Sequence, residues 1–181
     1  LRLQTTAVEL NPGVIAAGHA WFHLPRDSAR LSLLEQDAAS FVAEPQRADS
    51  VQVLCVDLYD HEAAAPVLDS EDFYADCRRI LSDDGVMSVN LFGRDASLAR
   101  SVQHIAAVFG AIQVRTMQPT REGNSIVVAL KSEPFPTQSM LAARAQNIET
   151  RFHLPAAKWL RMIRALPPTA HPSPEPEPAS E

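Results

Sequence analysis

Two aspartates, Asp57 and Asp60, stand three positions apart, directly after the most apolar run of the chain, residues 51–56. Such a run predicts a buried strand, and ligands in open α/β sheets bind just beyond the carboxyl ends of strands. An amine nucleophile is mostly protonated at neutral pH, so it needs a base before it can attack. One carboxylate of the pair can hold an ammonium group while the other takes its proton. The pair predicts a reaction centre for an amine, although Asp60 alone is also typical of a turn.

Two more acids end the strands that precede this run. Glu9 closes a predicted strand at residues 5–10, where a carboxylate of a nucleotide-binding unit commonly accepts hydrogen bonds from ribose hydroxyls. The alternative is that it caps the helix that begins at Asn11 and Pro12 or simply faces solvent. Asp37 follows a predicted strand at residues 30–35. It can accept a hydrogen bond from an adenine amino group, or it can cap the next helix, and taken alone the cap is the simpler interpretation.

The elements that must position these acids alternate between strand and helix patterns. Strands are predicted at residues 5–10, 30–35, 51–56, 86–92, 111–117 and 125–130, and helices at 12–22, 38–43, 70–81, 96–109, 137–150 and 156–166. The alternation predicts a parallel sheet covered on both faces. The short turn at 119–124 predicts that the last two strands are antiparallel neighbours. This order indicates an α/β fold of the methyltransferase-type Rossmann-like class, with a mostly parallel sheet and a C-terminal antiparallel hairpin.

Composition narrows the function classes. The chain has 181 residues, 46% of them hydrophobic, and 16 basic against 22 acidic residues give a formal net charge of −6. Nucleic acid is therefore not an expected partner, because binding phosphates needs a basic surface. No apolar run is long enough to span a membrane, and no signal-peptide pattern is present, so we expect a cytoplasmic protein without a membrane partner. Both cysteines, Cys55 and Cys77, are expected to be reduced packing residues.

The chain is expected to divide into three parts. Residues 1–133 form the Rossmann-like catalytic domain, residues 134–166 form C-terminal helices that pack on this domain or on a partner, and residues 167–181 form a disordered tail rich in proline and glutamate. A homodimer is compatible with this division. Because the chain opens directly into a strand with Leu1 rather than methionine, we expect the domain to be incomplete at its N-terminus.

Four segments in order resemble the polyamine aminopropyltransferases, the spermidine synthase family. Residues 7–11 are similar to the ribose-binding strand of that family, residues 36–38 to its adenine-contact motif, and residues 56–60 to its catalytic loop. Residues 73–86 are similar to its helix-to-strand segment. The glycine-rich motif and the first strand of the family have no counterpart here. The resemblance implies that this strand and loop are absent from the chain.

For the donor side of the site, the resemblance implies that decarboxylated S-adenosylmethionine is a co-substrate and that no cofactor is tightly bound. Glu9 would contact the ribose, and Asp37 with Ala38 would contact the adenine. A methyltransferase of the same fold, which uses intact S-adenosylmethionine, is the first alternative.

For the acceptor side, the resemblance implies transfer of an aminopropyl group to a diamine such as putrescine. Asp57 would be the general base, and Asp60 with Tyr59 would bind the amine. No metal is required, because the thioether leaving group needs no acid. The paired acids favour this function over the methyltransferase, and over a second alternative, a relative without catalytic activity.

Overall fold

The computed structural model describes residues 3–59, 66–92, 96–121, 123–132 and 134–167. In chain order the elements are β1 (Thr5–Glu9), α1 (Pro12–Trp21), β2 (Leu31–Glu35), α2 (Ala38–Ala43), β3 (Val51–Val56), α3 (Glu71–Ile80), β4 (Leu81–Phe92), α4 (Ala96–Phe109), β5 (Val114–Met117), β6 (Asn124–Leu130), α5 (Gln138–Phe152), α6 (Ala156–Leu160) and β7 (Ile163–Ala165). The predicted alternation of strands and helices is thus confirmed, and the fold is α/β. The predicted disordered tail lies outside the described residues, except for Pro167.

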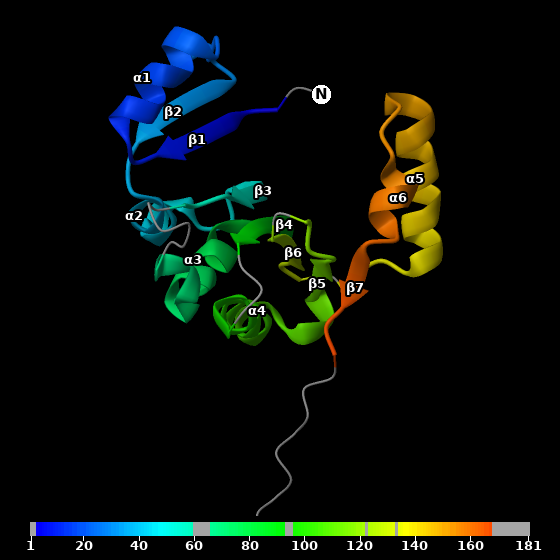
Figure 1. Ribbon diagram of the computed structural model, residues 1–181. Helices are drawn as coiled ribbons and strands as arrows, with labels where there is room; N and C mark the ends of the chain where they lie inside the picture. The colour runs from blue at the N-terminus through cyan, green and yellow to red at the C-terminus, as the bar shows by residue number, and fades with distance from the viewer. Residues whose placement is uncertain (1–2, 60–65, 93–95, 122, 133, 168–181) are drawn as a thin grey trace, which may run out of the picture.

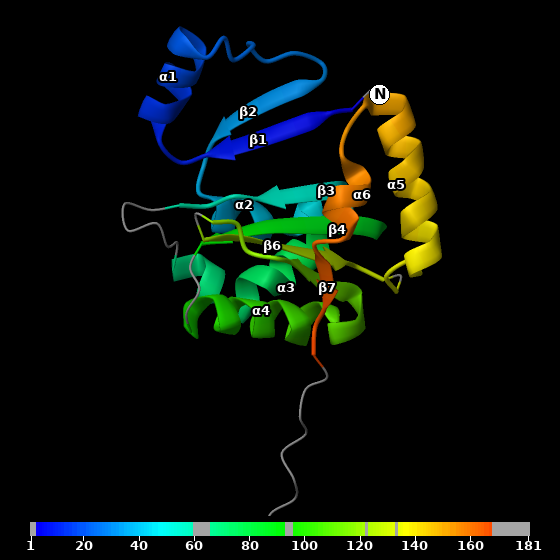
Figure 2. The same ribbon diagram turned by 45° about the vertical axis from the view of Figure 1, so that its right-hand side comes forward.

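The strands form two separate sheets (Figure 1). β1 and β2 pair in parallel, whereas the other strands form a mixed sheet in the order β3-β4-β6-β5-β7. Within the mixed sheet β3 and β4 are parallel, and β6 is antiparallel to both β4 and β5. The predicted C-terminal hairpin of β5 and β6 is therefore confirmed. β1, β2 and β3 run in the same direction, so their carboxyl ends point to the same side of the molecule (Figure 2).

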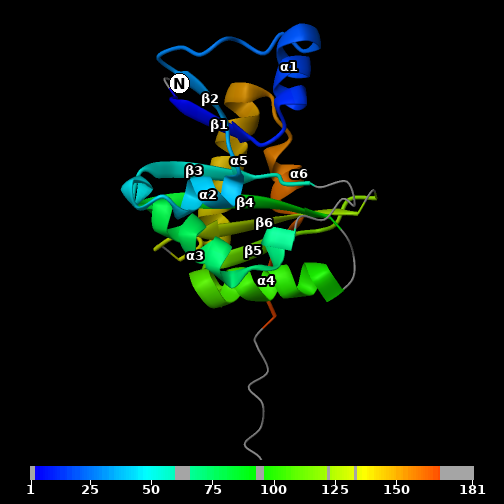
Figure 3. The same cartoon turned by 90° about the vertical axis from the view of Figure 1, so that its left-hand side faces the viewer.

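Helices cover the mixed sheet unequally. α2, α3 and α4 lie on one face, and α5 and α6 lie on the other (Figure 3). The core lies under α3 and α4, where the alternate side chains of β4 that face these helices, Met87, Val89 and Leu91, are buried. The opposite face of β3 is open, since the side chains of Val53 and Cys55 are exposed. The prediction that Cys55 is a packing residue is therefore wrong, because in the described part of the chain that side of its strand is left exposed.

Local sequence signals explain where the helices begin and end. The side chains of Asn11, Asp37 and Ser70 occupy the N-cap positions of α1, α2 and α3 and accept backbone hydrogen bonds there. Gly110, which follows α4, has a φ of 89°, a conformation that glycine adopts without strain. Residues 84–85 lie within β4 as a bulge, because the pairing with β3 shifts register between Val51 and Val53.

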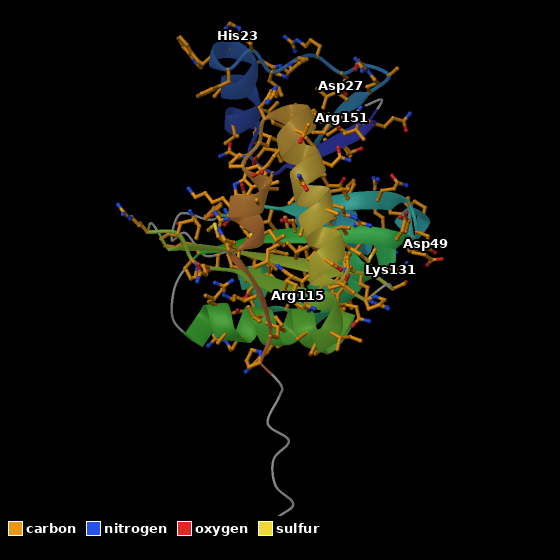
Figure 4. The ribbon with its side chains drawn as sticks, turned by 90° about the vertical axis from the view of Figure 1, so that its right-hand side faces the viewer. His23, Asp27, Asp49, Arg115, Lys131 and Arg151 are labelled. Carbon is orange, nitrogen blue, oxygen red and sulfur yellow. The ribbon has the colours of Figure 1, made fainter. Side chains whose placement is uncertain are left out.

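The C-terminal segment differs from its prediction. The helix predicted over residues 156–166 ends at Leu160, and Ile163–Ala165 forms β7 on the free edge of β5. This half of the prediction is wrong because strand pairing with β5 outweighs the local helical pattern. At the amino ends of the strands, Lys131 after β6 bonds to Asp49, which precedes β3 (Figure 4). Within the described residues, no helix combines the length and the apolar character that crossing a membrane requires.

Candidate active site

The centre of the candidate site is Asp57, the first residue after β3. Its side chain is exposed, and its Oδ1 accepts a hydrogen bond of 2.9 Å from Nδ2 of Asn90 on β4. The register of the two parallel strands explains this contact. Val56 pairs with Val89, so the next residues along each strand, Asp57 and Asn90, come to lie side by side. The apolar strand thus places a carboxylate at its carboxyl end, as the sequence predicts.

Tyr59 joins the same group of polar side chains. Its hydroxyl accepts a hydrogen bond of 2.6 Å from Nδ2 of Asn90 and donates one of 3.3 Å to Oδ1 of Asn124 at the start of β6. Burial and, to a smaller degree, the negative charge of Asp57 raise the pKa of Tyr59 above its ordinary value. The phenol therefore keeps its proton at neutral pH and remains a donor.

The amide of Asn90 has only one orientation that fits its neighbours. The carboxylate of Asp57 accepts hydrogen bonds but donates none, so the amide nitrogen must face it. Both protons of this nitrogen are then used, one by Asp57 and one by Tyr59. Asn90 Oδ1 points elsewhere and is buried without a partner. The side chain therefore acts as a fixed clamp that sets the spacing between the acid and the phenol.

Sequence reasoning missed both asparagines. A signal for Asn90 does exist in the sequence, because this polar residue interrupts the apolar run of residues 86–92 near the carboxyl end of the strand. Parallel pairing of the two strands places Asn90 beside Asp57. No comparable signal exists for Asn124. It lies in a turn segment where asparagine is common, and only the antiparallel pairing of β6 with β4 brings it near Tyr59.

The residues expected on the donor side lie at the carboxyl ends of β1 and β2. Glu9 is at the end of β1, and its Oε1 accepts a hydrogen bond of 2.7 Å from the backbone of Asn11. Asp37 is the N-cap of α2, and its Oδ1 accepts one of 2.8 Å from the backbone of Ser40. Ala38 is the first residue of α2 and is half-buried. Asp37 therefore caps α2, whereas Glu9 holds the backbone of Asn11, the residue that caps α1. Each acid keeps a second carboxylate oxygen that can accept a further hydrogen bond.

Glu9 and Asp37 share one edge, because β1 and β2 are parallel and Glu9 pairs with Glu35. Glu9 also lines a cavity of about 320 Å³ between α1 and the loop that follows it, together with Ile15, Leu24 and Leu33. Neither Asp37 nor Asp57 lines this cavity. Its apolar wall suits the flat face of a ring system better than a charged group.

The structure does not join the two halves of the candidate site. Within the described part of the chain, no hydrogen bond links Glu9 or Asp37 to Asp57 or Tyr59, and Asp60 lies outside the described residues. The described residues also contain no cluster of three or more side chains of the types that bind metal ions. The arrangement provides an acid, a phenol and two amides at the mixed sheet, one acid at the end of β1 and one acid at the start of α2.

Comparison with known proteins decides the relationship. The chain is 30% identical over 161 residues to the polyamine aminopropyltransferase of Chromobacterium violaceum. The aligned region covers 88% of this chain and 60% of that protein. The chain is thus similar in sequence to the polyamine aminopropyltransferases. The enzyme of the same name from Neisseria meningitidis is 29% identical over 90% of this chain and 61% of its own length. The chain thus spans about three fifths of the curated relatives it matches. No family model matches it.

Solved structures confirm the fold. Spermidine synthase from Thermotoga maritima superimposes with a TM-score of 0.67 at 19% identity, covering 91% of this chain and 57% of that one. A spermidine synthase in complex with the transition-state analogue AdoDATO superimposes with a TM-score of 0.66 at 18% identity, and the match covers 91% of this chain and 57% of that one. Human methyltransferase-like protein 13 in complex with SAH superimposes with a TM-score of 0.65 at 22% identity, and the match covers 92% of this chain and 75% of that one. The resemblance in sequence to the polyamine aminopropyltransferases and the Rossmann-like fold are therefore both confirmed, and the relatives are transferases.

Proposed function

We propose that this protein transfers an aminopropyl group from decarboxylated S-adenosylmethionine to a diamine such as putrescine. The observation that carries the proposal is the exposed carboxylate of Asp57 at the carboxyl end of β3, held by Asn90 beside the hydroxyl of Tyr59. The names of the curated relatives support the reaction class. A primary amine has a pKa close to that of lysine, so a base next to its binding position answers the main chemical need of the reaction.

In the proposed step, the amine nitrogen attacks the aminopropyl carbon that is bonded to the sulfonium. A carbon–nitrogen bond forms as the carbon–sulfur bond breaks, and the bonding pair stays on sulfur, which leaves as a neutral thioether. Before the attack, the ammonium form of the amine gives one proton to the carboxylate of Asp57, so that the neutral nitrogen has the lone pair that forms the new bond. Tyr59, and Asp60 next to it in sequence, would hold the amine in place. The leaving group needs no acid, so two carboxylates and a phenol suffice on the acceptor side.

On the donor side, Glu9 would accept hydrogen bonds from the ribose hydroxyls, and Asp37 with Ala38 would contact the adenine. The free oxygen of each carboxylate is compatible with this role. The position of both acids at the carboxyl edge of parallel strands also supports it, because nucleotides bind at that edge in α/β folds.

The test compares Asp57→Asn with the wild type in protein isolated as its natural host produces it. The asparagine keeps the size of the side chain but cannot take a proton, so turnover with putrescine should fall roughly 10²- to 10⁴-fold. Binding of the thioether nucleoside should stay within about threefold, since Asp57 belongs to the acceptor side. Asp83→Asn is the matched control, because Asp83 is exposed in the bulge of β4. Turnover of each variant and of the wild type is measured by chromatography as release of the thioether nucleoside.

The same assay separates the alternatives. Transfer of a methyl group from intact S-adenosylmethionine, with none from the decarboxylated form, would make the protein a methyltransferase. No turnover with either donor would make it a relative without catalytic activity. Equal turnover of Asp57→Asn and the wild type would exclude Asp57 as the base.

A further inference from the structure

The hydroxyl of Tyr59 has two hydrogen-bonding neighbours, which leave it a single free position. Nδ2 of Asn90 donates a bond of 2.6 Å to it, and the hydroxyl donates one of 3.3 Å to Oδ1 of Asn124. Because the pKa of Tyr59 is raised, the hydroxyl carries its proton at neutral pH, and this proton lies on the side of Asn124. A hydroxyl has one proton and two lone pairs. One lone pair therefore remains for a ligand, and no proton does.

The direction of the hydroxyl proton depends on Asn124. Asn90 cannot accept this proton, because its amide nitrogen faces Tyr59 and Asp57 and donates to both. Within the described part of the chain, Oδ1 of Asn124 is the acceptor that takes it. Without Asn124 the hydroxyl could turn its proton toward the carboxylate of Asp57, whose negative charge reaches Tyr59. Asn124 thus keeps the proton away from the acid.

Strand pairing and a turn hold Asn124 in place for this contact. Asn124 begins β6 and pairs with Phe92 of β4, two residues beyond Asn90, so both asparagines lie on the same face of the sheet. The backbone N–H of Asn124 donates to Oγ1 of Thr120 at 3.3 Å, and its carbonyl accepts from the backbone of Thr120 at 2.8 Å. The acceptor for the Tyr59 proton therefore stands on backbone that is fixed by both β4 and the turn.

Asp57 and Tyr59 lie close enough together to hold one ligand group. Both accept hydrogen bonds from the same nitrogen, Nδ2 of Asn90, at 2.9 and 2.6 Å. Their two oxygens are therefore no farther apart than the sum of these distances. A ligand nitrogen that donates two hydrogen bonds of ordinary length can span this separation, as the amide nitrogen does. Both side chains are exposed, so such a ligand can reach them from solvent.

We propose that Asn124 is a positioning residue, which holds the proton of the Tyr59 hydroxyl so that Tyr59 and Asp57 accept hydrogen bonds from one ammonium group. Two acceptors favour a nitrogen with at least two N–H bonds, so primary and secondary amines fit, whereas an alcohol has a single donor. After Asp57 has taken one proton, the neutral amine can still donate to Tyr59. That this ammonium is the attacking group rests on the proposed function, whereas its binding does not.

The test measures whether Asn124 acts through Tyr59, in protein isolated as its natural host produces it. Tyr59→Phe removes the hydroxyl and should raise the KM for putrescine at least about tenfold, and Asn124→Ala should raise it about three- to tenfold. In both variants kcat should stay within about threefold, because the base is unchanged. Added to Tyr59→Phe, Asn124→Ala should raise the KM no further, since the hydroxyl that it orients is gone.

Two control variants separate the role of Asn124 from a general effect on the fold. Asn124→Asp keeps an acceptor and cannot donate, so the KM for putrescine should stay at or below that of the wild type. Asn147→Ala is the matched control, because it makes the same substitution at an exposed position of α5. It should leave both KM and kcat unchanged.

Binding without turnover distinguishes this inference from the proposed function. Putrescine is titrated in the presence of the thioether nucleoside, which has no aminopropyl group to transfer. Nuclear magnetic resonance of protein with isotope-labelled tyrosine rings follows the signal of Tyr59, which is identified by its absence in Tyr59→Phe. Putrescine should shift this signal, and the concentration for half-saturation should rise about three- to tenfold in Asn124→Ala.

Three outcomes would overturn the positioning role. These are an equal rise in KM when Asn124→Ala is made with and without Tyr59→Phe, a KM of Asn124→Asp as high as that of Asn124→Ala, and a Tyr59 signal that does not respond to putrescine. If putrescine binds with the expected dependence on Asn124 but the wild type transfers no aminopropyl group, the positioning role is supported and the proposed function alone is contradicted.

Discussion

The two sheets of this molecule use similar strands and helices but differ in how deeply they are buried. The largest fully buried side chains belong to the unit of α3, α4 and the mixed sheet; they are Tyr74, Cys77, Ile80, Leu81, Met87, Val89, Ile105, Val114 and Val127. In the unit of β1, α1 and β2, no described residue is buried. Trp21 and Phe22 at the end of α1 are 78% and 80% exposed.

The difference shows that a strongly apolar sequence is not sufficient to make a core. α1 contains mostly apolar residues, but it faces only two strands, and a two-stranded sheet has little surface to bury it. The mixed sheet offers five strands to α3 and α4. Asp57 and Asn90 thus stand on a rigid support, and so does Asp37, because it caps α2, whose Phe41 and Val42 are buried in the core. Glu9, in contrast, stands on a unit that we expect to open locally at low cost in free energy.

Truncating one isoleucine in each unit should give the largest difference between the units in lost free energy of unfolding. Ile105→Ala empties a fully buried position in α4 and should lower the free energy of unfolding by about 2–5 kcal/mol. Ile15→Ala in α1 removes the same atoms from a half-buried position, and the loss should be below about 1 kcal/mol. Denaturant unfolding followed by circular dichroism measures both. Equal losses would mean that the β1–β2 unit is as much a part of the cooperative core as the mixed sheet.

The two cysteines sharpen the contrast within the larger unit. Cys55 is exposed on the open face of β3, while Cys77 lies on the buried face of α3, where burial raises the pKa of its thiol to about 12. At pH 8, a disulfide reagent should therefore modify Cys55 at least about 100-fold faster than Cys77. Absorbance of the released chromophore gives both rates, and in denaturant the two thiols should react alike. If the Cys55→Ser variant still contains a thiol that reacts fast with the reagent, then packing of α3 does not protect Cys77.

Much of the fold could be predicted because its signals are local. The caps Asn11 and Ser70, the stop at Gly110 and the apolar run of β3 each depend on a few neighbouring residues. The strand at Ile163–Ala165 could not be found in this way, because it forms only through pairing with β5. The exposure of Val53 likewise depends on which strands are present beside β3.

The site was predictable to the same extent. Asp57 follows an apolar strand, so its position could be inferred from the sequence alone. The clamp of Asn90, and the contact of Tyr59 with Asn124, depend on register between strands that are far apart in the chain. Whether Glu9 and Asp37 serve the donor was left open by their sequence. Asp37 does fill the capping role that was its alternative, while the cap of α1 is Asn11, whose backbone Glu9 holds.

The smallest contrast concerns the helix caps. Ser70 accepts the backbone hydrogen bond of Phe73 at 3.2 Å to begin α3, and Asn11 accepts that of Gly13 at 2.8 Å to begin α1. Ser70→Ala should lower the free energy of unfolding by about 1 kcal/mol, since α3 belongs to the core. Asn11→Ala should change the free energy of unfolding by less than about 0.3 kcal/mol, although hydrogen exchange in α1 should accelerate. The reason is that the β1–β2 unit opens locally, so a loss of stability within it does not affect the global unfolding transition. If Asn11→Ala instead matches Ser70→Ala, then the β1–β2 unit unfolds together with the mixed sheet, and the donor and acceptor halves of the site share one cooperative structure.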